Sequence, residues 1–198
     1  AMKELISPIL SDMPEIGKCQ SKFLETLFPA ILATRGHVTF RNLARHSDLH
    51  EKTYRRQFAR DFDYVSFNRR LIDESLCPDS ERISALDASF IKKAGKSTHG
   101  PGFFYNGCHH RLEKGLEIAS LAIVDLTYQT AFTLSVRQSV ALAEKKDQLD
   151  EETMIDQYMD HIRDVRPFLH AGETTLVLDG AFAKIKVFKV LEVLGLTG

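Results

Sequence analysis

The sequence predicts an α/β protein, with a helical N-terminal part followed by elements in the order β-β-β-α-β-α. Two observations support this prediction. Apolar residues recur at helical spacing before Cys77, whereas after it they alternate or form the continuous runs typical of strands. The change falls at Cys77-Pro78-Asp79, where proline beside polar residues indicates a turn or a linker. We therefore expect a helical domain over residues 1–76 and a sheet-containing domain over residues 77–198.

The N-terminal part contains several helical segments. Residues 20–34 place large apolar side chains on one helical face, and we expect Pro29 to kink or divide this helix and Gly36 to end it. Two short helices are expected over residues 39–46 and 50–60. Residues 61–68 are aromatic and irregular, and one or two further helical turns follow up to Ser75.

The C-terminal part alternates strands and helices. Strands are predicted at residues 83–92, 116–126, 129–138 and 174–180, and helices at residues 150–166 and 182–195. The second and third strands form a hairpin around Thr127–Tyr128, and Gly195 is a candidate C-cap. Three antiparallel strands, a crossover helix and a returning strand make an α/β sheet, and this order is also the first two-thirds of an RNase H-like fold.

Composition excludes several classes of protein. No apolar run approaches the ~18 residues that span a bilayer, and the N-terminus lacks the pattern of a secretory signal. Three distant cysteines, Cys19, Cys77 and Cys108, argue against a disulfide framework and fit a cytoplasmic protein. The net charge of −1 conceals a basic segment, since Arg35–Arg60 holds seven Lys/Arg against two acids. That segment is either a nucleic-acid-binding face or a solvated helix surface.

Residues 38–60 have the pattern of a helix-turn-helix. Thr39 can cap the first helix, Ser47-Asp48-Leu49 forms the turn, and Tyr54 and Phe58 of the second helix are expected to face inward. The basic and polar residues left for double-stranded DNA are Arg41, Arg45, Lys52, Thr53, Arg55, Arg56, Gln57 and Arg60. The alternative is a small helical bundle whose basic residues are merely solvated.

Two aspartates stand in unusual positions. Asp87 lies in the middle of a predicted strand, and Asp179 lies at the end of a short apolar strand. A carboxylate there is costly unless a cation or hydrogen bonds offset it, and hard oxygen ligands favour Mg²⁺ or Mn²⁺ over zinc. Two such acids on neighbouring strands suit a metal site for phosphoryl transfer. The alternative is that both are turn or edge residues, because Asp179-Gly180 is a common turn dipeptide.

Residues 86–139, which begin LDASFIKKAGKSTHG, resemble the first catalytic block of bacterial insertion-sequence transposases of the DDE superfamily, which are related in fold to retroviral integrases. In that family an aspartate stands in a D-x-S/T-F/Y context, here Asp87, Ser89 and Phe90. A second block, D-G-x-F/Y/W-x-K, matches Asp179-Gly180, Phe182 and Lys184. Residues 35–68 resemble the DNA-binding region that precedes the catalytic block.

The resemblance implies metal-dependent DNA strand cleavage and transfer at transposon ends. Asp87 and Asp179 would be the first two acids of a Mg²⁺ or Mn²⁺ site, with no small-molecule cofactor and no membrane. Residues between the first two strands would contact the DNA backbone: Lys92, Lys93, Lys96, His99, His109, His110 and Arg111. Cys108-His109-His110 suggests zinc by residue type, but no second Cys/His pair lies at ligand spacing.

The sequence departs from the family pattern in one respect. The third acid, a glutamate on a later helix, is absent, and Glu192 is on the wrong helix to replace it. We therefore expect the chain to be a truncated and inactive portion of a transposase, whose open sheet edge favours a homodimer. The first alternative is a DNA-binding regulator or competitor without catalysis. The second is a transcription factor with an α/β sensor domain, which would need a ligand pocket.

Overall fold

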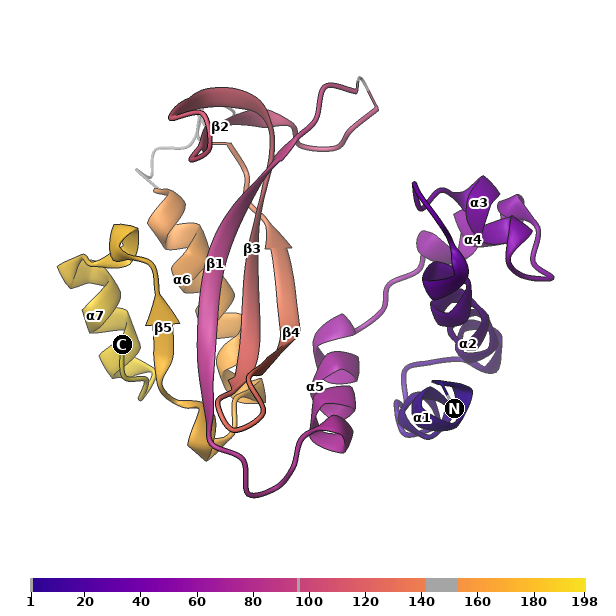
Figure 1. Cartoon of the computed structure of the whole chain (residues 1–198), viewed down its shortest axis with the longest axis horizontal. Coiled ribbons are helices and arrows are strands. Elements are labelled where there is room, and N and C mark those ends of the chain that lie inside the picture. Colours follow the sequence, from indigo (N-terminus) through magenta and orange to yellow (C-terminus); the bar gives the residue numbers. More distant parts are fainter. Residues whose placement is uncertain (1, 96, 142–152) are drawn as a thin grey trace. The chain divides into compact units, whose positions relative to one another are not determined.

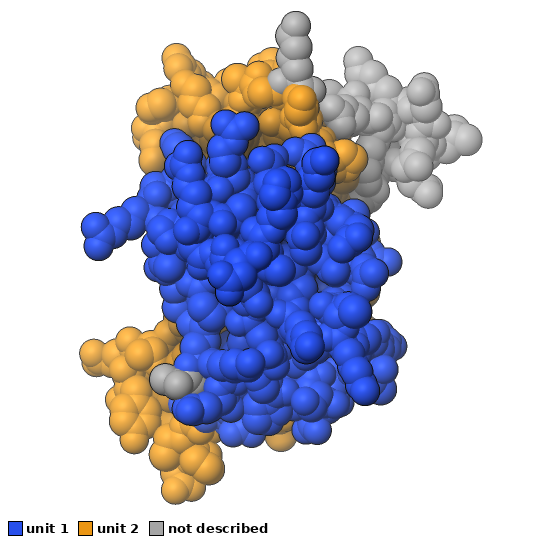
Figure 2. Space-filling view, turned by 90° about the vertical axis from the view of Figure 1, so that its right-hand side faces the viewer, with its two compact units in different colours: residues 1–75 blue, residues 76–198 orange. Residues whose placement is uncertain are grey.

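The computed structural model describes residues 2–95, 97–141 and 153–198. The chain divides into two compact units, Ala1–Ser75 and Leu76–Gly198 (Figure 2). Lys96 and the first residues of the helix predicted at 150–166 lie outside the described residues.

The first unit is helical. Its helices are α1 (Met2–Ser11), α2 (Lys18–Ala33), α3 (Phe40–Arg45), α4 (Glu51–Phe58) and α5 (Tyr64–Ser75). The helices predicted at residues 20–34, 39–46 and 50–60 are confirmed with small changes of boundary. Thr39 caps α3 as predicted, since its hydroxyl accepts a hydrogen bond from the Asn42 N–H at 3.2 Å. Pro29 does not divide α2.

Two parts of this unit differ from the prediction. Helix α1 was not predicted, and the segment expected to be irregular is helical from Tyr64 onward. The Asp63 carboxylate accepts the Ser66 N–H at 2.9 Å, which starts α5 just after the short irregular stretch. Phe67 is buried, so the aromatic residue at this position packs from a helix into the core and does not indicate a loop.

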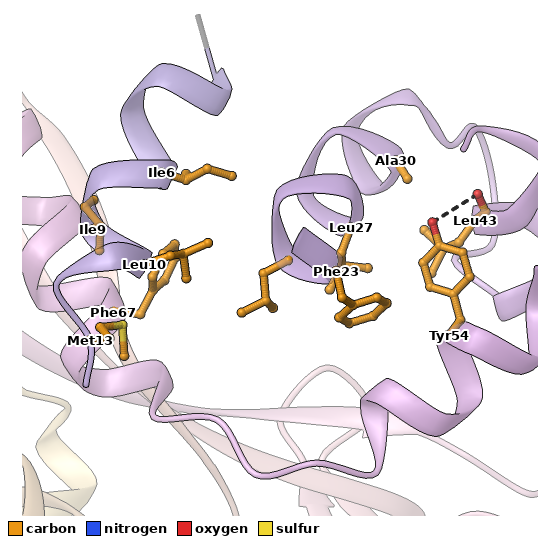
Figure 3. Packing of buried hydrophobic residues seen from close by; sticks show 11 residues of the cluster. Ile6, Ile9, Leu10, Met13, Phe23, Leu27, Ala30, Leu43, Tyr54 and Phe67 are labelled. Carbon is orange, nitrogen blue, oxygen red and sulfur yellow. Dashed lines mark hydrogen bonds between the residues drawn. The ribbon is translucent and has the colours of Figure 1, made fainter. Parts of the chain in front are cut away.

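The core of the first unit joins side chains from all five helices (Figure 3). Leu10, Phe23 and Leu27 are buried there, and each such side chain contributes about 1.5–3 kcal/mol when removed from water. Tyr54 is fully buried, and its hydroxyl lies 2.6 Å from the Ser47 hydroxyl in the turn before α4. This bond ties the second short helix to the turn that the sequence predicted.

The second unit is built on a sheet. Within the described residues its strands are β1 (Arg82–Lys92), β2 (Gly102–Asn106), β3 (Arg111–Asp125), β4 (Thr130–Gln138) and β5 (Leu176–Leu178). The central strand pair is β1 and β3, which run antiparallel along their length (Figure 1). Strands β2 and β4 pair with opposite ends of β3, whereas β5 pairs with the other edge of β1 in parallel.

The α/β class is confirmed, and so are the strands predicted at residues 83–92, 116–126, 129–138 and 174–180. The predicted order lacked β2, a short strand bounded by glycine and a turn. Pairing with β3 stabilises it, and no local pattern in so short a segment could reveal that partner.

Helix α6 (Met154–Val165) covers one face of the sheet (Figure 1). Thr153 and Asp156 form a capping box at its start. Its Met159 and Ile162 are fully buried, as are Leu121 and Leu134 of the sheet. Helix α7 (Ile185–Val193) follows β5 and ends as predicted, because Gly195 adopts a φ of +63° after its last turn.

His161 of α6 is fully buried against β4, where its Nε2 lies 2.8 Å from the Ser135 hydroxyl. Burial, with a smaller contribution from the nearby Arg137 guanidinium, lowers the pKa of His161 from 6.5 to about 4; Asp164 acts weakly in the opposite direction. The unfolded chain therefore binds a proton in a pH range where the folded chain does not.

We predict that stability is lost as the pH falls from 6.5 toward 4. The free energy of unfolding should decrease by about 1.4 kcal/mol per pH unit in this window because of His161 alone. His161→Gln, which cannot be protonated, should flatten that slope. Urea denaturation at pH 7 and pH 5 measures it, and an equal slope in both proteins would contradict the assignment to His161.

Candidate functional site

The pairing of β1 with β5 brings the two singled-out aspartates to adjacent positions. The parallel register pairs Ala85 with Val177 and Leu86 with Leu178. Asp87 follows Leu86 within β1, and Asp179 is the first residue after β5, where its backbone is still extended, with φ −63° and ψ 153°. Neighbouring strands lie about 4.8 Å apart, so the two carboxylates start from neighbouring backbone positions.

The alternation of side chains along β1 and β5 predicts that both aspartates lie on the face of the sheet opposite Leu86 and Leu176. Side chains alternate along a strand, so Asp87 shares a face with Ala85, and Asp179 shares one with Val177. Paired residues of parallel strands point the same way, which puts both carboxylates on one side. Both side chains are exposed, and no hydrogen bond or ion pair from another described residue holds either of them.

A hydrogen-bonded tyrosine lies close to this region. The Tyr158 hydroxyl of α6 donates to Glu117 Oε1 of β3 at 2.5 Å, and its ring packs on Phe182, just after Asp179, with centroids 5.1 Å apart. Burial raises the pKa of Tyr158 well above its ordinary value, and the bond to Glu117 and the charge of Asp87 raise it further. Tyr158 is therefore a neutral donor that fixes Glu117 and supports the segment after Asp179.

The donor set at the aspartate pair consists of two carboxylates. Among the residues that the structure describes, no group of three or more His, Cys, Asp or Glu side chains could hold a metal ion. Glu192 is exposed on α7 and joins no such group. A pair of exposed carboxylates still fits Mg²⁺, which keeps several waters and binds through one or two carboxylates plus phosphate oxygens.

The basic residues predicted to bind DNA lie mostly on the surface of α3 and α4. The exposed members are Arg41, Arg45, Lys52, Arg55, Arg56 and Arg60. Two of them are partly neutralised, because Arg55 lies 3.1 Å and Arg41 3.9 Å from Glu51. Thr53 is half-buried. Arg45, Lys52, Arg56 and Arg60 are thus the cations best able to serve a ligand.

Two side chains of α4 are placed differently from the prediction. Gln57 is only 7% exposed, and its side-chain oxygen has no hydrogen-bond partner among the described residues, so it lies in the interior and not on the basic surface. Phe58 was expected to face inward but is 44% exposed, although its ring packs 5.1 Å from that of Phe40. His50 caps α4 by accepting the Lys52 N–H at 3.2 Å.

The segment that runs from the end of β1 to the start of β3 is rich in basic residues. Lys92, Lys93, His99, His110 and Arg111 are exposed, whereas Lys96 lies outside the described residues.

Glu113 was missed by the sequence interpretation. Its carboxylate accepts hydrogen bonds from Asn106, His109 and Arg111 at 2.7–2.9 Å. These bonds, that of Asn106 foremost, lower the pKa of Glu113 to about 2. The signal that could have revealed this cluster is the single acid among the basic residues of a tight turn.

The three cysteines are free and exposed, and no helix in the described parts of the chain is long and apolar enough to cross a bilayer.

A scan of the chain against protein-family models found no match, and a search of curated proteins found none either.

We predict that Tyr158→Phe destabilises the second unit. Losing a donor to a partly buried carboxylate costs about 1–3 kcal/mol, which urea denaturation followed by circular dichroism would detect. In an absorbance titration at 295 nm, the variant should also lack a tyrosine whose raised pKa makes it ionise at higher pH than an ordinary tyrosine. Tyr64→Phe, at an exposed position of the first unit, serves as the control. Unchanged stability and titration in Tyr158→Phe would contradict the role given to this hydroxyl.

Proposed function

We propose that the chain has the sequence of a DDE-type DNA transposase, in which Asp87 and Asp179 form part of a metal-dependent phosphoryl-transfer site. The observation that carries the proposal is the register of β1 and β5, which gives the two aspartates adjacent positions on one open face. The sequence analysis expected the two acids to share one metal site. Their adjacency is what a shared cation requires.

The topology of the second unit supports this proposal. Three of its antiparallel strands occur in the order β4-β3-β1, and β5 then joins β1 in parallel after the crossover helix α6. This is the order expected for the first part of an RNase H-like domain. The α3–turn–α4 segment, with its exposed cations, supports a helix-turn-helix that binds double-stranded DNA.

The aspartates would act by holding a cation and, through it, the scissile phosphate. A bound Mg²⁺ or Mn²⁺ supplies charge neutralisation at phosphate oxygens. Asp87 lies within the long β1 strand and Asp179 starts a short 3-10 turn, Gly180–Phe182, that packs on Tyr158. Regular structure therefore fixes the backbone positions from which the two exposed carboxylates project.

A second function is favoured by one observation. No third acidic side chain joins the pair among the described residues. A chain that binds DNA without cutting it would act as a regulator or competitor of a complete transposase.

Divalent-metal-dependent nicking of supercoiled plasmid tests the first function. We expect any nicking to require Mn²⁺ or Mg²⁺ and to vanish in both Asp87→Asn and Asp179→Asn, but to persist in Asp79→Asn, an exposed aspartate outside the strands. Nicking that survives in both site variants would contradict the assigned site. Absence of nicking, with DNA binding retained, would favour the regulator.

Binding of duplex DNA should depend on α4. Each phosphate contact contributes roughly one unit to the slope of log affinity against log salt. Lys52→Ala/Arg56→Ala should therefore lower that slope by about two and weaken binding at every sequence tested. Fluorescence anisotropy over a salt series measures this. Lys18→Ala/Lys189→Ala removes the same charge at other exposed positions and should change the slope less; an equal change would show that net charge, not α4, governs binding.

A further inference from the structure

The β2–β3 hairpin exposes large apolar side chains. Phe103, Tyr105 and Leu112 are 65%, 57% and 66% exposed. The antiparallel register pairs Tyr105 with Leu112 and Phe103 with Lys114, so these four residues share one face. The intervening Phe104 and Glu113 are buried on the opposite face. Adjacent exposed apolar side chains of this size mark an interaction surface.

The two aromatic rings are spaced for stacking. Phe103 and Tyr105 are two residues apart on one strand, which separates them by about 6.6 Å. That distance is comparable to the separation of successive bases in an extended single strand. Bases of any sequence stack on exposed aromatic side chains, since every base has a π-face.

The charge around these rings selects an anionic occupant. Residues 92–115 contain five Lys/Arg and one acid, Glu113. That acid is buried, and Asn106, His109 and Arg111 satisfy its oxygens. The charge on the aromatic face is therefore cationic and comes from Lys114, whereas Arg111 lies on the opposite face, 2.6 Å from the Glu113 carboxylate. A ligand that combines flat apolar rings with a phosphate backbone matches both the aromatic rings and the charge of Lys114.

We propose that the face formed by Phe103, Tyr105, Leu112 and Lys114 binds unpaired nucleotides of DNA. Bases stack on Phe103 and Tyr105, while Lys114 contacts the phosphates. The choice of DNA rests on the proposed function, because strand cleavage and transfer expose unpaired nucleotides. The stacking itself does not depend on Asp87, Asp179 or a metal ion.

The test compares single-stranded and double-stranded DNA without divalent cations. Anisotropy is measured for the full chain with a fluorescein-labelled oligothymidine and with a duplex of equal length, in the presence of EDTA. Phe103→Ala/Tyr105→Ala should weaken single-strand binding roughly fivefold or more and leave duplex binding nearly unchanged. Phe188→Ala removes an aromatic ring that is 54% exposed on α7 and should leave both unchanged.

A second variant reports stacking directly. The sequence contains no tryptophan, so Phe103→Trp introduces a single one, whose emission should be quenched by the single strand and not by the duplex. Unchanged emission, or single-strand affinity that survives the double substitution, would overturn the proposal. The proposal would also be overturned if Phe103→Ala/Tyr105→Ala abolished self-association in analytical ultracentrifugation but left single-strand binding intact. That result would make the face a contact between copies of the chain. These outcomes leave the nicking and duplex-binding tests unaffected, so failure here is separable from failure of the proposed function.

Discussion

The pairing of β5 with β1 is the interaction on which the candidate site depends. It involves three residue pairs, and a slip by one residue would move Asp179 to the other face of the sheet. Ser84 prevents such a slip. Fully buried, it donates its hydroxyl to the Glu173 carbonyl at 2.7 Å and its N–H to the Thr175 carbonyl at 2.8 Å. These two hydrogen bonds, to residues just before β5, thereby hold this short strand in one register against β1.

This pairing also explains the different surroundings of the two faces. Leu86 and Leu176 are buried, whereas the alternate positions, Asp87 and Val177, are exposed. Burial of these leucines thus specifies which side of the sheet each carboxylate takes. The acids incur little desolvation because they lie on the opposite side from the packed core.

Much of this organisation could be predicted from the sequence, and the failures have physical causes. Alternating and helical hydrophobic patterns identified the long elements, because those patterns record which face is buried. They missed β2 and α1, which are short or depend on partners distant in sequence. They placed Gln57 on the DNA-binding surface because helical spacing alone does not reveal which neighbouring helices cover a position.

The candidate site shows the same division. Asp87 and Asp179 were identifiable as acids in apolar strands, but their adjacency is a property of register, which local sequence does not encode. The exposed aromatic face of the hairpin likewise could not be predicted before β2 was known to pair with β3, since only this pairing places Phe103, Tyr105 and Leu112 on one face. Glu113 stays ionised on the opposite face, where Asn106, His109 and Arg111 hold its carboxylate.

The measurement that tests the central claim most directly is the location of bound manganese in crystals of the full chain. Anomalous scattering from crystals soaked in Mn²⁺ should reveal a peak between the carboxylates of Asp87 and Asp179, and that peak should disappear in Asp179→Asn. Manganese bound elsewhere, or a structure in which the two carboxylates lie on opposite faces of the sheet, would contradict the account.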